Sequence, residues 1–183
     1  MKNYIPVKLE DLDLNAWQAF GEDWVAIAAG GRKHANAMTA SWGSIGVVWG
    51  KPAVTIYMRP QRYTRGFVEK KGRFSINFLP AGPESRKALR YIGEVSGRDE
   101  DKLANAGLTL AIVDKTPVLE QADLVLNCRV MYRSQIESNK FIDREFSKKL
   151  YPEKDYHYVY VGEIISAYRL VEAAPENTLE ENS

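Results

Sequence analysis

Short stretches in which apolar and polar residues alternate dominate the chain. In residues 73–79, large apolar residues alternate with smaller polar ones, among them Asn77, and this is the period of a strand with one buried face. Residues 38–42 alternate in the same way, with Thr39 and Ser41 between apolar neighbours. Both stretches predict strands, and the second has small side chains on one face, which leaves room beside the sheet.

Further strands are predicted where β-branched and aromatic residues gather between turn residues. These predicted strands cover residues 24–28, 54–58, 108–113, 124–132 and 157–170. Helices are predicted for residues 64–71, with Thr64 as the N-terminal cap and Gly72 as the stop, for 84–92 and 99–106, and for 140–150 within a charged insert, 137–155. Helices are thus the minority element.

Many short strands with glycine-rich turns and a few helices predict an α+β protein, mainly β, built as a barrel or a sandwich. A chain of 183 residues is most naturally one domain, which we expect to span residues 1–170. Trp17 and Phe20 are expected to pack on its core. Residues 171–183 are acidic and have little to bury, so a frayed tail is expected there.

Composition and charge narrow the classes of function. With 25 basic and 24 acidic residues the net charge is +1, so no binding to nucleic acid or to an anionic membrane is expected. The single cysteine, Cys128, excludes an intrachain disulfide, and two histidines without a spaced acidic set make a metal site unexpected. No apolar run has the length of a signal peptide or a membrane span, so the cytoplasm is the expected compartment.

Two arginines stand directly before a predicted helix. Arg59 and Arg62, with Tyr63 and Thr64, end an apolar run at the point where the helix begins. A helix start offers unpaired N–H groups and the positive end of the helix dipole, so a phosphate is expected over Thr64 with an arginine beside it. On these residues alone a solvated turn is an equally good interpretation, and solvent-facing hydroxyls are the simpler one for Thr39 and Ser41.

Five segments, in this order, resemble the flavin reductase-like family of FMN-binding split barrels, which includes flavoredoxin-type proteins. They are NAMTASW at 36–42, RPQRYT at 59–64, FSIN at 74–77, SGRD with DKL at 96–103, and HYVYVGE at 157–163. The resemblance spans most of the chain. It implies a six-stranded Greek-key split barrel with peripheral helices, and a homodimer with flavin near the subunit interface.

The resemblance also implies roles for single residues. In the family, the segment that matches residues 38–42 wraps the flavin ring, and a histidine before the last long strand lies near the flavin. His157 is therefore expected to position the nicotinamide, although a surface histidine is the simpler interpretation. For Asn77, the simpler interpretation is a polar residue on a strand with its hydrogen bonds satisfied. The implied contacts with FMN come from Met38, Thr39, Ala40, Ser41, Trp42, Arg59, Arg62, Tyr63, Thr64 and Asn77.

The expected activity follows from this resemblance and from what the sequence lacks. No Rossmann G-x-G-x-x-G, P-loop or G-x-S-x-G motif is present, and flavin chemistry needs none of them because the isoalloxazine ring carries the redox step. We expect an FMN-binding oxidoreductase that transfers hydride between NADH or NADPH and flavin. A flavoredoxin-like electron carrier that serves a protein partner is the alternative. An RNA-binding barrel with Trp42 and Trp49 as stacking platforms is a third, disfavoured by the balanced charge.

Overall fold

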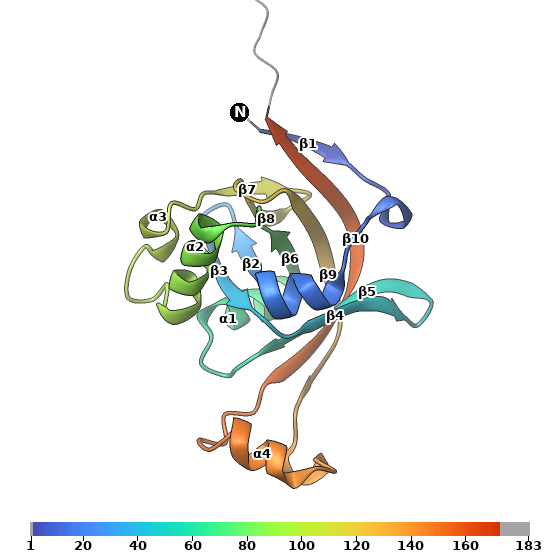
Figure 1. Ribbon diagram of the computed structural model, residues 1–183, viewed down its shortest axis with the longest axis vertical. Coiled ribbons are helices and arrows are strands. Elements are labelled where there is room, and N and C mark those ends of the chain that lie inside the picture. The colour runs from blue at the N-terminus through green and yellow to red at the C-terminus, as the bar shows by residue number, and fades with distance from the viewer. Residues whose placement is uncertain (1, 173–183) are drawn as a thin grey trace, which may run out of the picture.

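The protein is built around one curled antiparallel sheet, seen in Figure 1 in a computed structural model that describes residues 2–172. Eight strands belong to this sheet, in the order β3-β2-β6-β9-β10-β5-β4, with β1 paired to β10. β7 and β8 form a separate two-stranded sheet. The strands are β1 (Lys2–Pro6), β2 (Val25–Gly31), β3 (His34–Ala40), β4 (Gly43–Val48), β5 (Lys51–Met58), β6 (Arg73–Phe78), β7 (Leu110–Val113), β8 (Thr116–Leu119), β9 (Leu124–Gln135) and β10 (Tyr158–Glu172).

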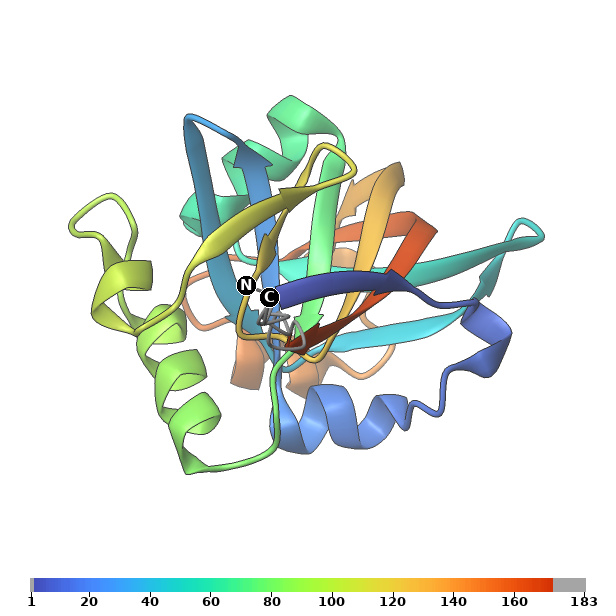
Figure 2. The same cartoon turned by 90° about the horizontal axis from the view of Figure 1, so that it is seen from above.

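The helices lie around the outside of the sheet, with α2 and α3 on one side and the β4–β5 hairpin reaching out on the other (Figure 2). The α-helices are α1 (Tyr63–Lys71), α2 (Pro83–Glu94), α3 (Lys102–Asn105) and α4 (Arg144–Leu150). Shorter helical turns are η1 (Leu9–Asp11), η2 (Gln18–Asp23) and η3 (Ser138–Lys140). This content confirms the predicted α+β class with strands as the main element.

The end of α1 was predicted correctly, whereas its cap was not. Gly72 takes a left-handed conformation with φ +63°, and its N–H donates to the carbonyl of Val68 at 2.8 Å, as a glycine stop requires. The helix begins one residue before Thr64, and Arg62 in the N-cap position makes no side-chain cap. The Thr64 hydroxyl instead accepts a hydrogen bond from Nδ2 of Asn36 at 2.8 Å, so it ties α1 to β3.

Both faces of β6 are buried, because β8 and its partner β7 cover the face that carries the polar residues. Ser75 donates to the carbonyl of Pro117 at 2.6 Å, and the N–H of Leu119 donates to Oδ1 of Asn77 at 2.8 Å. Pro117 falls between the strands predicted for 108–113 and 124–132, and it lies within β8 opposite Ile112. A proline fits there because β8 is an edge strand of a two-stranded sheet.

Three further predictions at the periphery need correction. Phe20 packs in the core with 3% of its surface exposed, but Trp17 is 87% exposed. The surface helix predicted for 140–150 is shorter, since α4 begins at Arg144. Strand β10 continues to Glu172, so the first two residues of the tail predicted for 171–183 belong to a strand, and its residues 173–183 lie outside the described residues.

Three strand ends meet at one edge of the sheet. β3 ends at Ala40, β5 ends just before Arg59, and β10 begins just after His157. Because Tyr158 pairs with Met58, Arg59 and His157 lie side by side. The 137–155 insert also leaves the sheet there, from the end of β9, with α4 below the barrel in Figure 1. Segments far apart in sequence are thereby brought to one place.

Candidate functional site

A pocket of about 210 Å³ opens where these three strand ends meet. We call it the central pocket. Its wall combines small side chains, aromatic rings and two guanidinium groups. The lining residues are Met38, Thr39, Ala40, Ser41, Trp42, Tyr57, Arg59, Arg62 and His157.

Eight of the eleven residues predicted for the site line this pocket, and three do not. The Thr64 side chain is fully buried against Asn36. Tyr63 packs edge-on against Phe67 at 4.9 Å between ring centroids. Asn77 is fully buried and donates to the carbonyl of Ala26 at 3.1 Å. The structure therefore does not bring these three side chains to the pocket, and Asn77 is a satisfied polar residue of the core.

The insert holds Arg59. The Arg59 guanidinium forms an ion pair with Oδ2 of Asp155 and donates from Nη2 to the carbonyl of Leu150 at 3.1 Å. Gln61 donates to the same Asp155 oxygen at 2.9 Å. These hydrogen bonds, from Gln61 and then Arg59, lower the pKa of Asp155, so this carboxylate is charged at neutral pH. Arg59 is fixed at the mouth of the central pocket with part of its charge neutralised.

Arg62 and Lys102 hold the C-terminal end of α2. Arg62 donates to the carbonyl of Gly93, and Lys102 donates to those of Ile92 at 2.6 Å and Val95 at 3.0 Å. Cations stabilise a helix C-terminus, where carbonyl groups lack partners. Burial and the nearby Arg62 lower the pKa of Lys102 to about 8. The expected phosphate-binding arginine is thus also a structural tie between α1 and α2.

Thr39 lies directly beneath α2. Its hydroxyl donates to the carbonyl of Leu89, and a Cβ atom added to Gly93 would come within 3.2 Å of the Thr39 Cβ. That spacing is tighter than an ordinary contact, so α2 approaches β3 closely because residue 93 has no side chain. One side of the pocket floor is therefore set by a helix that packs on the sheet.

His157 is almost entirely enclosed, with 9% of its surface exposed. Its Nδ1 lies 2.9 Å from the hydroxyl oxygen of Tyr151, and the ring of Trp42 lies 4.7 Å away, centroid to centroid. Burial, and after it the charge of Arg59, lowers the pKa of His157 to about 4. The imidazole is consequently neutral at physiological pH and can present either a donor or an acceptor to the pocket.

A second, larger hollow of about 570 Å³ adjoins the central pocket. We call it the aromatic groove. It shares Ser41, Trp42 and Tyr57 with the central pocket and continues to Trp17 and Phe20. Trp42 and Tyr57 meet edge to face at 6.5 Å. The two hollows together offer flat apolar faces next to cationic and hydroxyl groups.

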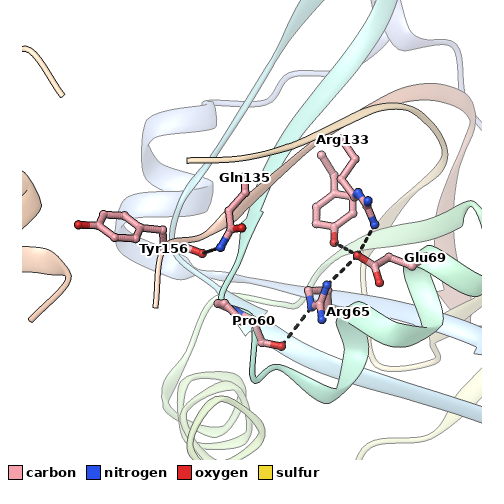
Figure 3. Close-up of polar contacts among 7 residues, drawn as sticks. Pro60, Arg65, Glu69, Arg133, Gln135 and Tyr156 are labelled. Carbon is pink, nitrogen blue, oxygen red and sulfur yellow. Dashed lines mark hydrogen bonds and ion pairs between the residues drawn. The ribbon is translucent and has the colours of Figure 1, made fainter. Parts of the chain in front are cut away.

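A polar network fixes the loop that carries Arg62 (Figure 3). Nε of Arg65 donates to the carbonyl of Pro60 at 3.1 Å, while Glu69 accepts from Arg65 and Arg133 at 2.8 Å and from the Tyr160 hydroxyl at 2.9 Å. Burial alone would raise the pKa of Glu69, but these partners, Tyr160 first, lower it. The carboxylate therefore joins α1 to β9 and β10 behind the central pocket.

Two hydrogen bonds hold the base of the insert to the barrel. Nε2 of Gln135, at the end of β9, donates to the carbonyl of Tyr156 at 3.2 Å (Figure 3). The N–H of Ile136 donates to the carbonyl of His157 at 2.9 Å. Both bonds cross from the strand that enters the insert to the strand that leaves it. The backbone of Tyr156 and His157 is accordingly fixed to the barrel.

Among residues 2–172, no group of three or more histidine, cysteine, aspartate or glutamate side chains is placed to hold a metal ion. No helix in this part of the chain has the length and apolar character to cross a bilayer. Cys128 is fully buried and burial raises the pKa of its thiol.

Sequence reasoning missed three residues at the central pocket. Tyr57 lines it, and its position two residues before Arg59, on the same face of an extended chain, is a signal that could have found it. Tyr151 and Asp155 contact His157 and Arg59 from the insert. No local pattern predicts where an insert packs, so these two become visible only in three dimensions.

The sequence and the fold are similar to those of known proteins. Over 99 residues the chain is 33% identical to YddH, an uncharacterized protein of Escherichia coli K12, and this match spans 52% of the chain and 51% of YddH. An FMN-binding domain of a flavin reductase-like enzyme from Shewanella baltica superposes with a TM-score of 0.61 and 20% identity, covering 92% of this chain and 78% of the other. Flavoredoxin from Methanosarcina acetivorans gives 0.60 and 22%, covering 87% and 89%.

These structural similarities confirm the predicted split barrel. The family model described as the flavin reductase like domain matches residues 19–180 of this sequence, which is most of the chain and includes every residue that lines the central pocket. The protein therefore belongs to the flavin reductase-like family.

Proposed function

We propose that this protein is an FMN-binding oxidoreductase that transfers hydride between NAD(P)H and flavin at the central pocket. One observation carries the proposal. The end of β3, the two arginines after β5 and the histidine before β10, three segments distant in sequence, line a single hollow. The resemblance implies a different duty in flavin reduction for each of these segments, and their convergence supports a common site.

The chemistry of the lining fits a flavin mononucleotide. Outside the sheet ladder, the described residues contain no backbone hydrogen bond from the amides of Ser41 and Trp42, so these amides are available to the polar edge of the ring. The Ser41 side chain is exposed beside them. Trp42 and Tyr57 supply aromatic faces against which a flat ring can pack.

The two arginines retain donors for a phosphate. A guanidinium has five N–H donors. Within the described part of the chain, Arg59 makes two hydrogen bonds, to Asp155 and Leu150, and Arg62 makes one, to Gly93. Each can therefore bind an anion without giving up its structural partner. Thr64 and Asn77 have no place in the proposed set, because their side chains are buried elsewhere.

When bound, flavin supplies the redox chemistry by accepting hydride at its ring. The residues of this chain bind and orient. Arg59 and Arg62 would hold the phosphate, and the Ser41–Trp42 backbone the polar edge. His157, neutral and enclosed, would hydrogen-bond the carboxamide of a nicotinamide laid against the ring. No side chain has to exchange a proton in this scheme, which agrees with a histidine whose pKa lies far below physiological pH.

The experiment measures FMN binding first and turnover second. The visible spectrum of the purified protein, followed by titration with FMN, tests for the cofactor, and oxidation of NADH and of NADPH with added FMN tests for activity. We expect saturable FMN binding and turnover well above that of free flavin. Rates no higher than free flavin with both donors would refute the reductase activity. FMN held tightly under those conditions would favour an electron carrier.

We further propose that the protein forms a single domain, expected from its sequence to span residues 1–170 and extended by the last two residues of β10, and that it is a homodimer. The apolar side chains that stay exposed on the aromatic groove and the neighbouring hairpin, among them Trp17 at 87% and Trp49 at 67%, are compatible with a covered surface. Light scattering coupled to size exclusion would test the mass in solution. A monomer over the micromolar range would contradict the dimer.

A further inference from the structure

The 137–155 insert places one buried hydroxyl group against His157, beside the central pocket. Tyr151, directly after α4, is 4% exposed although the insert around it is largely open to solvent. Its ring stacks on Tyr156 at 4.6 Å between centroids and meets His157 edge to face at 5.5 Å. A phenol buried on a surface insert is unusual enough to require a partner, and that partner is His157.

The hydrogen bond between these two residues has a preferred direction. The Tyr151 hydroxyl lies 2.9 Å from Nδ1 of His157, and within the described residues this imidazole is the one side chain that hydrogen-bonds it. A neutral imidazole carries a proton on one nitrogen and a lone pair on the other. A phenol is a better donor than acceptor, so the arrangement that uses both groups best has the Tyr151 O–H donating to the lone pair of Nδ1.

The other imidazole nitrogen is open to the pocket. Among residues 2–172, the buried side-chain nitrogen and oxygen atoms without a partner are Oδ1 of Asn127 and Oδ1 of Asp155. Nε2 of His157 has no hydrogen-bond partner and is not one of these atoms, so it is accessible to solvent. Since His157 lines the central pocket, Nε2 is the atom that a ligand there would meet.

We infer that Tyr151 is a positioning residue: it fixes neutral His157 as the tautomer with its proton on Nε2, so that an N–H donor faces the central pocket. Such a donor suits a carbonyl oxygen, the acceptor that a nicotinamide carboxamide and the pyrimidine edge of a flavin both present. The opposite tautomer would aim a lone pair at that oxygen and repel it. The role of His157 rests on the proposed function, whereas the hydrogen bond can be tested without any ligand.

Nuclear magnetic resonance of the ¹⁵N-labelled protein gives the decisive readout, because the sequence holds only two histidines, His34 and His157. The His34→Gln variant assigns the signals. In the wild-type protein at neutral pH we expect the long-range ¹H–¹⁵N pattern of a neutral imidazole protonated at Nε2. An Nδ1-protonated pattern, or an exchanging mixture of both, would overturn the inference in the unmodified protein, whatever any variant does.

Two variants then test whether the Tyr151 hydroxyl fixes the tautomer of His157. Tyr151→Phe keeps the ring and the stack but removes the hydroxyl, and it should move the Nδ1 resonance of His157 toward that of a lone pair without a donor. Tyr156→Phe is the matched control, because it removes the hydroxyl of the other ring in the stack, which pairs with Ser147 at 2.9 Å, and it should leave that resonance in place. Equal shifts in both variants, or none in Tyr151→Phe, would refute the assignment.

Kinetics connect this positioning to the proposed function. If the protein oxidises NAD(P)H, Tyr151→Phe should lower kcat/KM by about two- to tenfold, the effect of one lost hydrogen bond, while Tyr156→Phe keeps the wild-type value. FMN affinity and melting temperature measured on the same samples separate a local change from unfolding. A protein without turnover but with the Nε2-protonated pattern would leave the inference standing and remove the reductase proposal. Turnover in which Tyr151→Phe keeps the wild-type kcat/KM would leave the reductase proposal standing and overturn the positioning role of Tyr151.

Discussion

Burial is the main influence on the imidazole of His157, and it makes the charged form costly. Asp155 lies close enough to favour that form, but Arg59 opposes it and the net effect lowers the pKa to about 4. The histidine is therefore suited to hydrogen bonding and poorly suited to proton transfer near neutral pH. Its lowered pKa should also make the free energy of unfolding depend on pH, which can be measured without any ligand.

His157 should make the folded protein less stable as the pH is lowered. Histidine in an unfolded chain titrates near 6.5, and His157 in the fold near 4, so between these values the unfolded chain binds more protons. The free energy of unfolding should decrease as pH falls below about 6.5 and level off near 4, by at most about 3 kcal/mol. Denaturant unfolding of wild type and His157→Gln across this range measures the difference. The exposed His34→Gln should keep the wild-type slope; a parallel pair of curves for His157→Gln would contradict the prediction.

Arg62 should matter for the phosphate of the ligand and little for its ring. Arg62→Ala removes a guanidinium that lines the central pocket, and a charge-assisted hydrogen bond is worth about 1.5–3 kcal/mol, so FMN should bind about 10- to 100-fold more weakly. Riboflavin, which has no phosphate, should lose far less. Fluorescence titration with both flavins measures this, and Arg32→Ala, which removes an equal charge from an exposed position between β2 and β3, away from the central pocket, is the control. Equal losses for the two flavins would show that the arginine acts only as the tie to Gly93.

At the scale of elements, the contact between α2 and β3 is close enough to be tested by adding one methyl group. Gly93→Ala would place a methyl group 3.2 Å from Thr39. Overpacking costs about 1–3 kcal/mol, while the helix propensity of alanine returns up to about 1 kcal/mol, so a net loss of at most about 2 kcal/mol is expected. Gly66→Ala is a matched control, since that glycine lies within α1 with no atom near the added Cβ, and alanine there should stabilise by up to about 1 kcal/mol. Thermal melts of both variants give the comparison. A Gly93→Ala variant as stable as wild type would mean that α2 shifts freely.

Strands were the most predictable elements, because their alternating pattern is local. Residues 73–79 show it plainly, and β6 lies there. Strand β8 escaped prediction because Pro117 normally interrupts a ladder, whereas an edge position accepts it. The cap of α1 was misassigned for a related reason: Thr64 has the right chemistry for a cap, but Asn36, 28 residues away in sequence, engages its hydroxyl.

At the scale of the whole molecule, the sequence predicted which segments line the central pocket but not which side chains of each segment face it. Arg62 and Thr64 are two residues apart at the start of α1, yet one lines the central pocket and the other is buried against Asn36. Asn77 faces away from the phenylalanines of β6 as predicted, but the hairpin of β7 and β8 covers that face. Direction within a segment depends on long-range packing, and a single sequence does not record it.

An ion pair between Asp155 and Arg59 joins the insert to the barrel, and the negative charge of Asp155 should weaken anion binding. Asp155 neutralises Arg59 at the mouth of the central pocket, and its Oδ1 is buried without a partner. Asp155→Asn keeps the size of the side chain and removes its charge. Phosphorylated flavin should then bind about three- to tenfold more tightly at low salt, and this gain should shrink as salt rises because the attraction is screened.

Glu145→Gln is the matched variant for this test. It removes an equal charge from the same insert, but Glu145 pairs with Lys148 on the open face of α4, where 78% of its side chain is exposed. Solvent screens a charge in that position, so its loss should not change FMN affinity. If both variants bind FMN alike, or if riboflavin affinity rises as much as that of FMN in Asp155→Asn, then Arg59 does not contact the phosphate, and Arg62 would be left to bind it.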